Sequence, residues 1–248
     1  MLSWTPIEPF GAVVDLDINA PRDAATEEAL RQLFDRHHLL VFRDQAVSHP
    51  DQIAFVSIFG KPLLSEQDGV GFISNEPGMG GLGDVELAFH SDLSFSPKPF
   101  DAICLHAVDV EDGRSSTRYI DSAMAYRRLP EALKGRIDAY NAMHVFGQSL
   151  SGRNTEDLPR DLPRSIHPLV LRHPRTGEKI LYVNYNQTAR IVELSREDSD
   201  ALIEDLFACS YRPEAVYEHY WRMGDLVIWD NLAVQHARGD VSGVGKRT

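Results

Sequence analysis

Hydrophobic residues in this sequence fall mostly into short runs, which predict β-strands. The run at 39–42 is apolar throughout, as in a strand buried on both faces, whereas the stretch at 11–18 alternates in part and is rich in β-branched residues. Further runs predict strands at 102–108, 116–120, 166–172, 179–184, 216–222 and 226–229. Many short strands without a regular alternation of strand and helix indicate a mainly β fold with a jelly-roll core.

Longer segments between these runs repeat apolar residues at helical spacing or carry helix-capping signals. These segments predict helices at 26–38, 48–60, 122–129 and 130–143, and after Ser195. The stretch at 147–165 differs, because it mixes prolines and glycines with polar residues and has no apolar period. We therefore expect a mobile lid at 147–165, within a single domain that covers residues 1–248.

The composition narrows the range of partners. A formal net charge of -12 and a pI near 5.2 argue against nucleic acid and anionic membranes, which bind concentrated Lys and Arg. A small-molecule partner fits better, and a homo-oligomer is compatible with the sequence. The two cysteines, Cys104 and Cys209, lie among apolar residues and are too few for a disulfide framework. No signal peptide or stretch of about 18 apolar residues is present, so we expect a cytoplasmic protein.

The chemistry of the chain concentrates in the stretch 86–95, where His90 and Asp92 lie two residues apart between aromatic neighbours. In an extended strand the side-chain period is two, so both side chains are expected on one face, where two ligands could meet one metal ion. Two histidines and one carboxylate on one side of a metal form the usual site of non-haem Fe(II) oxygenases. The question is then which residue is the second histidine.

His236 is the best candidate for that second histidine. It follows a turn at 224–225 and a hydrophobic strand, which would deliver its side chain to the mouth of a sheet. The other histidines lie beside apolar residues or on predicted surfaces, and we interpret them as packed or exposed side chains. They are His37, His38, His49, His106, His144, His167, His173 and His219.

The order and spacing of these residues resemble the taurine and 2,4-dichlorophenoxyacetate dioxygenase family of Fe(II)- and 2-oxoglutarate-dependent oxygenases. His90 and Asp92 are similar to the His-x-Asp pair of the family, and His236 to its distal histidine. Thr117, 27 positions after His90, resembles the threonine that helps to hold the cosubstrate. Arg247, 11 positions after His236, resembles the arginine that binds the remote carboxylate of 2-oxoglutarate. The runs 181–184 and 190–192 also resemble family segments, and the similarity covers nearly the whole chain.

This resemblance implies a double-stranded β-helix (cupin-like) core in a single catalytic domain. It further implies Fe(II) held by His90, Asp92 and His236, with 2-oxoglutarate as cosubstrate and O2 as oxidant. A small-molecule substrate would be hydroxylated while 2-oxoglutarate is decarboxylated to succinate. If the hydroxylated carbon bears a heteroatom, the product can fall apart, so hydroxylation can lead to cleavage.

Two alternatives use the same fold. One is a cupin-like zinc hydrolase or isomerase, since the same ligand set can hold other divalent metals, and the other is a non-catalytic binding protein. Arg247 and Thr117 disfavour both, because neither alternative needs a buried receptor for a second carboxylate.

The sequence departs from the family pattern at two places. Gly113-Arg114-Ser115-Ser116 stands where relatives often have a Gly-Gly-Asp segment before the threonine, and a further arginine four positions after Arg247 would fall beyond Thr248. A strand that stopped at Thr248 would leave Arg247 on a fraying terminus. We therefore expect the natural chain to continue beyond Thr248.

Overall fold

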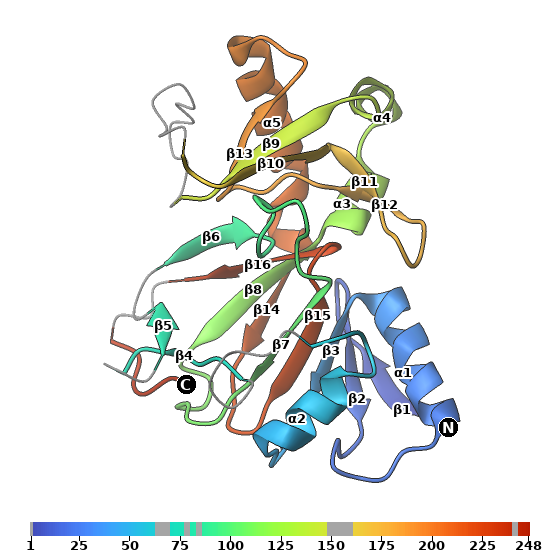
Figure 1. Ribbon diagram of the computed structural model, residues 1–248, viewed down its shortest axis with the longest axis vertical. Coiled ribbons are helices and arrows are strands. Elements are labelled where there is room, and N and C mark those ends of the chain that lie inside the picture. The colour runs from blue at the N-terminus through green and yellow to red at the C-terminus, as the bar shows by residue number, and fades with distance from the viewer. Residues whose placement is uncertain (1, 63–69, 77–79, 83–85, 148–160, 240–242) are drawn as a thin grey trace.

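Two β-sheets form the centre of the molecule in the computed structural model, which describes residues 2–62, 70–76, 80–82, 86–147, 161–239 and 243–248 (Figure 1). The five-stranded sheet has the order β1 (Ser3–Pro6), β2 (Ala12–Asp15), β3 (Leu39–Phe42), β15 (Leu226–Asp230), β7 (Ala102–His106). The four-stranded sheet has the order β14 (Val216–Tyr220), β8 (Ser116–Asp121), β16 (Val234–Arg238), β6 (Leu87–His90). All neighbouring strands are antiparallel except β2 and β3.

The two sheets share one hydrophobic core. Leu39 and Val41 of β3 pack with Trp229 of β15 and with Tyr119 and Val234 of the four-stranded sheet. The alternate residues of β3 are also fully buried, because they face the helical layer on the outer side of the five-stranded sheet. Burial on both faces explains why the run 39–42 is apolar throughout. The packing of the two sheets also confirms the predicted jelly-roll core.

Capping side chains set where the main helices begin. Asp23 accepts a hydrogen bond from the backbone N–H of Thr26 at the start of α1 (Ala24–His37), which covers β3 and β15. Ser48 and Ser195 cap α2 (His49–Val56) and α5 (Arg196–Ser210) in the same way. These three helices were predicted from the sequence and are confirmed.

A second group of elements lies at the end of the molecule opposite α2 (Figure 1). Its three-stranded sheet has the order β10 (Arg164–Pro168), β9 (Asn141–Val145), β13 (Thr188–Ile191), and α5 packs against β13. The remaining elements are α3 (Ser122–Arg128), α4 (Glu131–Ile137), β11 (Val170–Arg172), β12 (Lys179–Leu181), the 3-10 turn Pro213–Ala215, β4 (Ile73–Ser74) and β5 (Gly81–Leu82).

One sequence prediction in this region is wrong in part, and another falls mainly outside the described residues. The helix predicted at 130–143 ends at Ile137, and β9 follows, because Ala142 and Val145 are buried where β9 pairs with strands on both sides. The lid predicted at 147–165 falls largely on residues 148–160, which lie outside the described part of the chain. Its last two residues belong to β10 rather than to a loop.

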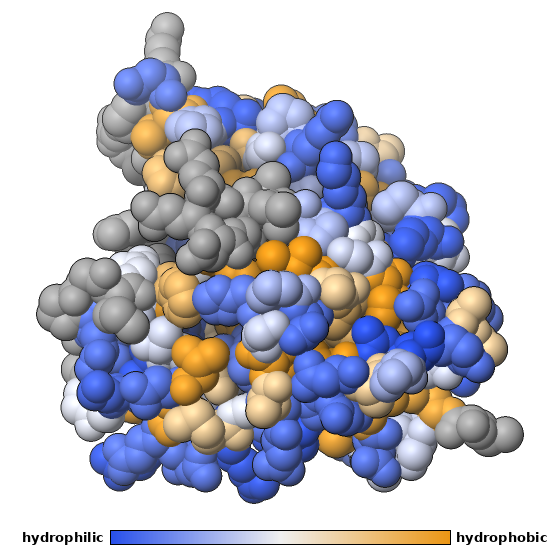
Figure 2. Space-filling view, turned by 60° about the horizontal axis from the view of Figure 1, so that its bottom comes forward, coloured by the Kyte–Doolittle hydropathy of each residue, from blue (hydrophilic) through white to orange (hydrophobic). Residues whose placement is uncertain are grey.

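Hydrophobic side chains reach the surface at several separate places. On the face shown in Figure 2, hydrophobic residues gather near the centre and hydrophilic residues along the lower edge. The more exposed large hydrophobic side chains come from separate loops and strands, among them Phe72, Phe146, Ile166, Tyr220 and Met223. Within the described residues, no helix combines the length and the hydropathy needed to cross a bilayer.

Candidate metal and cosubstrate site

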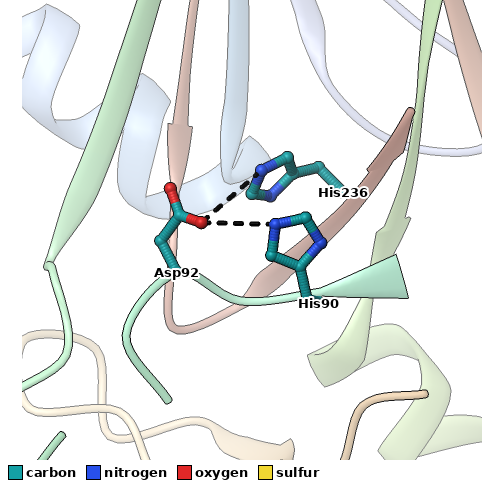
Figure 3. A group of neighbouring side chains, drawn as sticks. All are labelled: His90, Asp92 and His236. Atoms are coloured by element: carbon teal, nitrogen blue, oxygen red, sulfur yellow. Dashed lines mark ion pairs between the residues drawn. The ribbon is translucent and has the colours of Figure 1, made fainter. Parts of the chain in front are cut away.

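His90, Asp92 and His236 come together at one end of the four-stranded sheet (Figure 3). His90 is the last residue of β6 and pairs directly with His236 of β16, so their rings lie on the same face with centroids 4.2 Å apart. The Asp92 Oδ1 atom lies 3.3 Å from His90 Nε2 and 3.9 Å from His236 Nε2. One ligand atom from each residue lies within 4.8 Å of the others.

Asp92 reaches this position through a turn and not through the strand geometry expected from the sequence. β6 ends at His90, and the following turn includes Leu93 with a positive φ of 57°. The fully buried amide of Asn231 holds the turn, since its Oδ1 atom accepts a hydrogen bond from the Asp92 N–H at 2.8 Å. Its Nδ2 atom donates to the carbonyls of Asp92 and Phe100. The backbone of Asp92 is therefore held by a side chain from the end of β15.

The hydrogen bonds of His90 determine which ring nitrogen faces Asp92. Its Nδ1 atom lies 2.8 Å from the carbonyl oxygen of Ala88, which can only accept, so Nδ1 carries a proton. The Nε2 atom then faces the Asp92 carboxylate. A cation between these two atoms, either a proton or a metal ion, makes their contact favourable.

The protonation states of His236 and Asp92 also suit a metal ion. Burial lowers the pKa of His236 to about 3, with a further lowering from His90, so its imidazole is neutral at physiological pH. Burial alone would raise the pKa of Asp92, but the hydrogen bond with His90 and the proximity of His236 lower it. A bound metal ion would therefore meet two imidazole nitrogens and one anionic oxygen.

The spacing of these atoms fits a divalent metal. Ligand atoms at about 2.1 Å from a metal and at right angles lie about 3 Å apart, close to the 3.3 Å between His90 Nε2 and Asp92 Oδ1. His236 Nδ1 is buried without a hydrogen-bond partner in the described chain. Only small side-chain movements are needed to place the three atoms on one face of an octahedral ion.

Thr117 lies on the same inner face of the four-stranded sheet as His236. It is buried, and its Oγ1 atom accepts a hydrogen bond of 2.9 Å from the indole Nε1 of Trp221. Because one lone pair of the hydroxyl is used in this way, its O–H is directed elsewhere and can donate to a ligand. Trp221 lies 104 positions from Thr117 in the sequence, so no local pattern indicates this contact.

The backbone of Arg247 is held from two sides. Its N–H donates to Asn75 Oδ1 at 2.9 Å, its carbonyl accepts from Asn75 N, and it forms an isolated bridge with Val110. The neighbouring Thr248 exchanges backbone hydrogen bonds with Asp109. The expected fraying of Arg247 is therefore wrong, while continuation beyond Thr248 stays a prediction.

The guanidinium of Arg247 is buried and has no anionic partner among the described residues. Burial and, to a smaller extent, the nearby Arg238 together lower its pKa to about 10, so the group stays charged at neutral pH. Its Nη1 atom has no hydrogen-bond partner, and no carboxylate of the described residues forms an ion pair with it. Since a buried unpaired charge is unfavourable, the site calls for an anionic ligand.

The remaining histidines contribute to other contacts. His38, His173 and His219 each form an ion pair with a buried aspartate, and none of the eight joins the cluster around Asp92 among the described residues. Two side chains near the site were missed by sequence reasoning, Asn231 and Tyr119. Tyr119 could have been found because it lies two positions from Thr117 on one face of a strand.

Comparisons with known proteins agree with this geometry. A model of the family described as taurine catabolism dioxygenase TauD, TfdA family matches residues 3–248, so the chain belongs to this family. Pentalenolactone F synthase of Streptomyces avermitilis is 31% identical over 265 residues, covering 94% of this chain and 87% of the relative. The (S)-phenoxypropionate/alpha-ketoglutarate-dioxygenase of Sphingobium herbicidovorans is 30% identical, covering 92% of this chain and 85% of the relative.

A solved structure extends the likeness to the fold. The crystal structure of AAD-2 in complex with Mn(II) and N-oxalylglycine matches 100% of this chain and 94% of its own, with a TM-score of 0.84 and 26% sequence identity. The chain is thus a dioxygenase of the class that uses Fe(II), 2-oxoglutarate and O2. This excludes the two alternatives that the sequence left open, a zinc hydrolase or isomerase and a non-catalytic binding protein.

Proposed function

We propose that His90, Asp92 and His236 hold Fe(II), that Thr117 and Arg247 hold 2-oxoglutarate, and that the enzyme hydroxylates a small-molecule substrate. The observation that carries the proposal is the convergence of the three ligand atoms within 4.8 Å on the inner face of the sheet that also holds Thr117. Arg247 completes the arrangement as a buried cation for which the described part of the chain supplies no anionic partner.

The charges of the proposed site balance. Fe(II) brings two positive charges and Arg247 one, while Asp92 and the two carboxylates of 2-oxoglutarate bring three negative charges. In a buried site such a balance matters, because an uncompensated charge there is costly. The planar fork of a guanidinium also matches a carboxylate in two parallel hydrogen bonds, which supports assigning the remote carboxylate to Arg247.

The protein residues orient the reacting groups. Bound Fe(II) supplies the redox chemistry by which O2 and 2-oxoglutarate oxidise the substrate. The Ala88 carbonyl holds the ring of His90, and Asn231 holds the backbone of Asp92, so both ligands are preorganised. Arg247 and Thr117 fix the far end of the cosubstrate, which directs its keto acid end toward the three ligands.

The names of the relatives support a small organic substrate. They include dioxygenases named for (S)-phenoxypropionate, for 2,4-dichlorophenoxyacetate and for sulfate esters. N-oxalylglycine, named in the AAD-2 structure, has the skeleton of 2-oxoglutarate with NH in place of one CH2. We include cleavage after hydroxylation within the proposal, and a single catalytic domain over 1–248. The unpaired cysteines Cys104 and Cys209 support a cytoplasmic location.

Anaerobic spectroscopy tests the proposal. Fe(II) is added to the purified protein without oxygen, and 2-oxoglutarate is then titrated in. We expect a visible charge-transfer band that saturates with 2-oxoglutarate, because the keto acid chelates the metal. His236→Ala serves as the matched control and should give no band. If the wild-type protein binds Fe(II) but shows neither a band nor binding of 2-oxoglutarate, the proposed site is wrong.

A further inference from the structure

Tyr119 occupies the inner face of the four-stranded sheet between the metal ligands and the cosubstrate residues. In the register of β8 and β16 it pairs directly with His236, and it lies two positions from Thr117 on the same face. Its side chain is fully buried, and its ring contacts Trp229 of the opposite sheet at a centroid distance of 5.2 Å. The phenol is therefore part of the wall of the proposed site.

The hydroxyl of Tyr119 is buried without a hydrogen-bond partner among the described residues. Thr117, as a hydrogen-bonding side chain, and Arg247, through its charge, both lie close enough to act on this hydroxyl, so the three groups share one region of the interior. Burial raises the pKa of Tyr119 well above its ordinary value, with a further rise from Tyr217, so the phenol stays protonated. Its O–H is therefore available as a hydrogen-bond donor to a ligand.

Three donors thus converge where the proposed function needs an anion. In the described part of the chain, Arg247 Nη1 and the Tyr119 hydroxyl have no hydrogen-bond partner, and the Thr117 hydroxyl lies beside them with its oxygen already accepting from Trp221. Buried donors that lack acceptors are rare in folded proteins, because each costs free energy. Their gathering at one place indicates a ligand with several acceptor sites.

We propose that the Tyr119 hydroxyl donates a hydrogen bond to the remote carboxylate of 2-oxoglutarate, beside Arg247 and Thr117. This inference rests on the proposed function and adds a cosubstrate-binding residue to it. A carboxylate offers about four acceptor positions, enough for the guanidinium fork and two hydroxyls. Nothing in the proposed metal site changes.

The added donor makes the site selective for the dicarboxylate. A 2-oxo acid that ends in a methyl group would leave the guanidinium and both hydroxyls unpaired in a buried pocket. Sites built from several buried donors reject ligands that lack the matching acceptor, since each donor then loses its partner. Tyr119 should therefore contribute to the affinity for 2-oxoglutarate and contribute nothing to the affinity for 2-oxopentanoate.

The test compares wild type with Tyr119→Phe, which removes one oxygen atom and keeps the buried ring. Binding of 2-oxoglutarate and of 2-oxopentanoate to the Fe(II)-loaded proteins is measured without oxygen. We expect Tyr119→Phe to bind 2-oxoglutarate about 10- to 100-fold more weakly and 2-oxopentanoate unchanged. Its melting temperature without ligand should equal or exceed that of wild type, because an unpaired buried hydroxyl is lost.

Tyr217→Phe is the matched control. Tyr217 lies on the same face beside Tyr119, but its hydroxyl is already within 2.9 Å of His219 Nδ1. This variant should bind 2-oxoglutarate as wild type does. Unchanged 2-oxoglutarate affinity in Tyr119→Phe, or equal loss for both acids, would overturn the inference. If wild type itself failed to bind 2-oxoglutarate, the proposed function would fail instead, and the two results are distinguishable.

Discussion

The side-chain amide of Asn231 binds the backbone of Asp92 through both of its polar atoms. Oδ1 accepts from the Asp92 N–H at 2.8 Å, and Nδ2 donates to the Asp92 carbonyl at 2.9 Å. The pair joins the end of β15 to the turn after β6, two segments far apart in the sequence. Asp92 is thereby held at the correct position before any metal binds.

Replacing Asn231 should therefore weaken the metal site without removing a ligand. We expect Asn231→Ala to lower the affinity for Fe(II) or Mn(II) about 10- to 100-fold, as for other residues that support metal ligands. Metal titration of the purified variant measures this. Asn141→Ala is the control, since that amide binds Glu193 far from the site and should leave metal affinity as in wild type. Equal affinity in all three proteins would remove Asn231 from this role.

His236→Ala should abolish metal binding and keep the fold. The imidazole is neutral, and its Nδ1 atom has no partner in the described structure, so its removal breaks no hydrogen bond. Metal content after reconstitution and the melting temperature of the apo protein are the measurements. His144→Ala, which removes another buried neutral histidine, should lower stability but keep the metal. One bound metal ion per chain in His236→Ala would contradict the assignment.

Arg247→Gln should weaken 2-oxoglutarate binding and spare the metal. A charged, two-pronged contact is worth more than a neutral hydrogen bond, so we expect a loss of about 100-fold in affinity. Anaerobic titration of the metal-loaded variant measures it, and Fe(II) affinity is measured in parallel. Arg172→Gln, at an exposed position of β11, provides the control. A parallel loss of metal and cosubstrate would point to a damaged fold rather than to a lost carboxylate contact.

Thr117 should also affect stability, because it accepts the indole hydrogen bond of Trp221. Thr117→Val leaves that buried donor unpaired, which costs about 1–3 kcal/mol. Thr117→Ser keeps the acceptor and should stay closer to wild type. Denaturant unfolding of the ligand-free proteins makes the comparison, and equal stability of the Val and Ser variants would show that the indole does not depend on this acceptor.

The pH dependence of stability should reflect His38. This buried residue lies 3.2 Å from Asp121 and 3.1 Å from Glu178. Burial alone would lower the pKa of His38, but the hydrogen bond with Asp121 and the charges of Asp121, Asp230 and Glu178 raise it above 6.5. The same cluster includes Arg127, His173 and Arg175.

A raised pKa means that the folded state holds the proton more tightly than the unfolded state. The contribution of His38 is therefore complete below about pH 6.5 and is lost as pH rises through its folded pKa. Thermal melts from about pH 6 to about pH 9 should show the advantage of wild type over His38→Asn shrinking. The variant His37→Asn is the control. Burial lowers the pKa of His37, so His37 does not produce the loss of stability at alkaline pH, and this variant should lose stability with rising pH as wild type does. An advantage independent of pH would refute the assignment.

Much of the fold could be predicted from local patterns in the sequence. The run at 39–42, the helical spacing within 26–38 and the caps Ser48 and Ser195 depend on near neighbours, and these predictions were correct. The segment 130–143 was misread because its strand is specified by partners distant in the sequence: β10 and β13 pair with β9 on its two sides. Residues 138–143 have no local signal that outweighs that pairing.

The residues of the proposed site also differ in how far the sequence alone could identify them. His90, Asp92, His236, Thr117 and Arg247 were named from spacing and resemblance, and the structure brings the first three together. The roles of Asn231 and Trp221 depend on hydrogen bonds to Asp92 and Thr117 across long sequence separations, which no window of the sequence contains.

The contacts of Arg247 and Thr248 with residues 74–75 and 108–110 also bear on the order in which the protein folds. The proposed metal ligands come from β6 and β16, and the proposed carboxylate receptor comes from a segment later still. Long loops must close before these parts meet, so the site is a late product of folding. A nascent chain that has not yet released β16 has one histidine and one carboxylate but no complete site. Iron and 2-oxoglutarate can therefore bind and stabilise only chains that have finished folding. The supply of iron and cosubstrate then affects the stability of the folded protein and not the earlier folding steps.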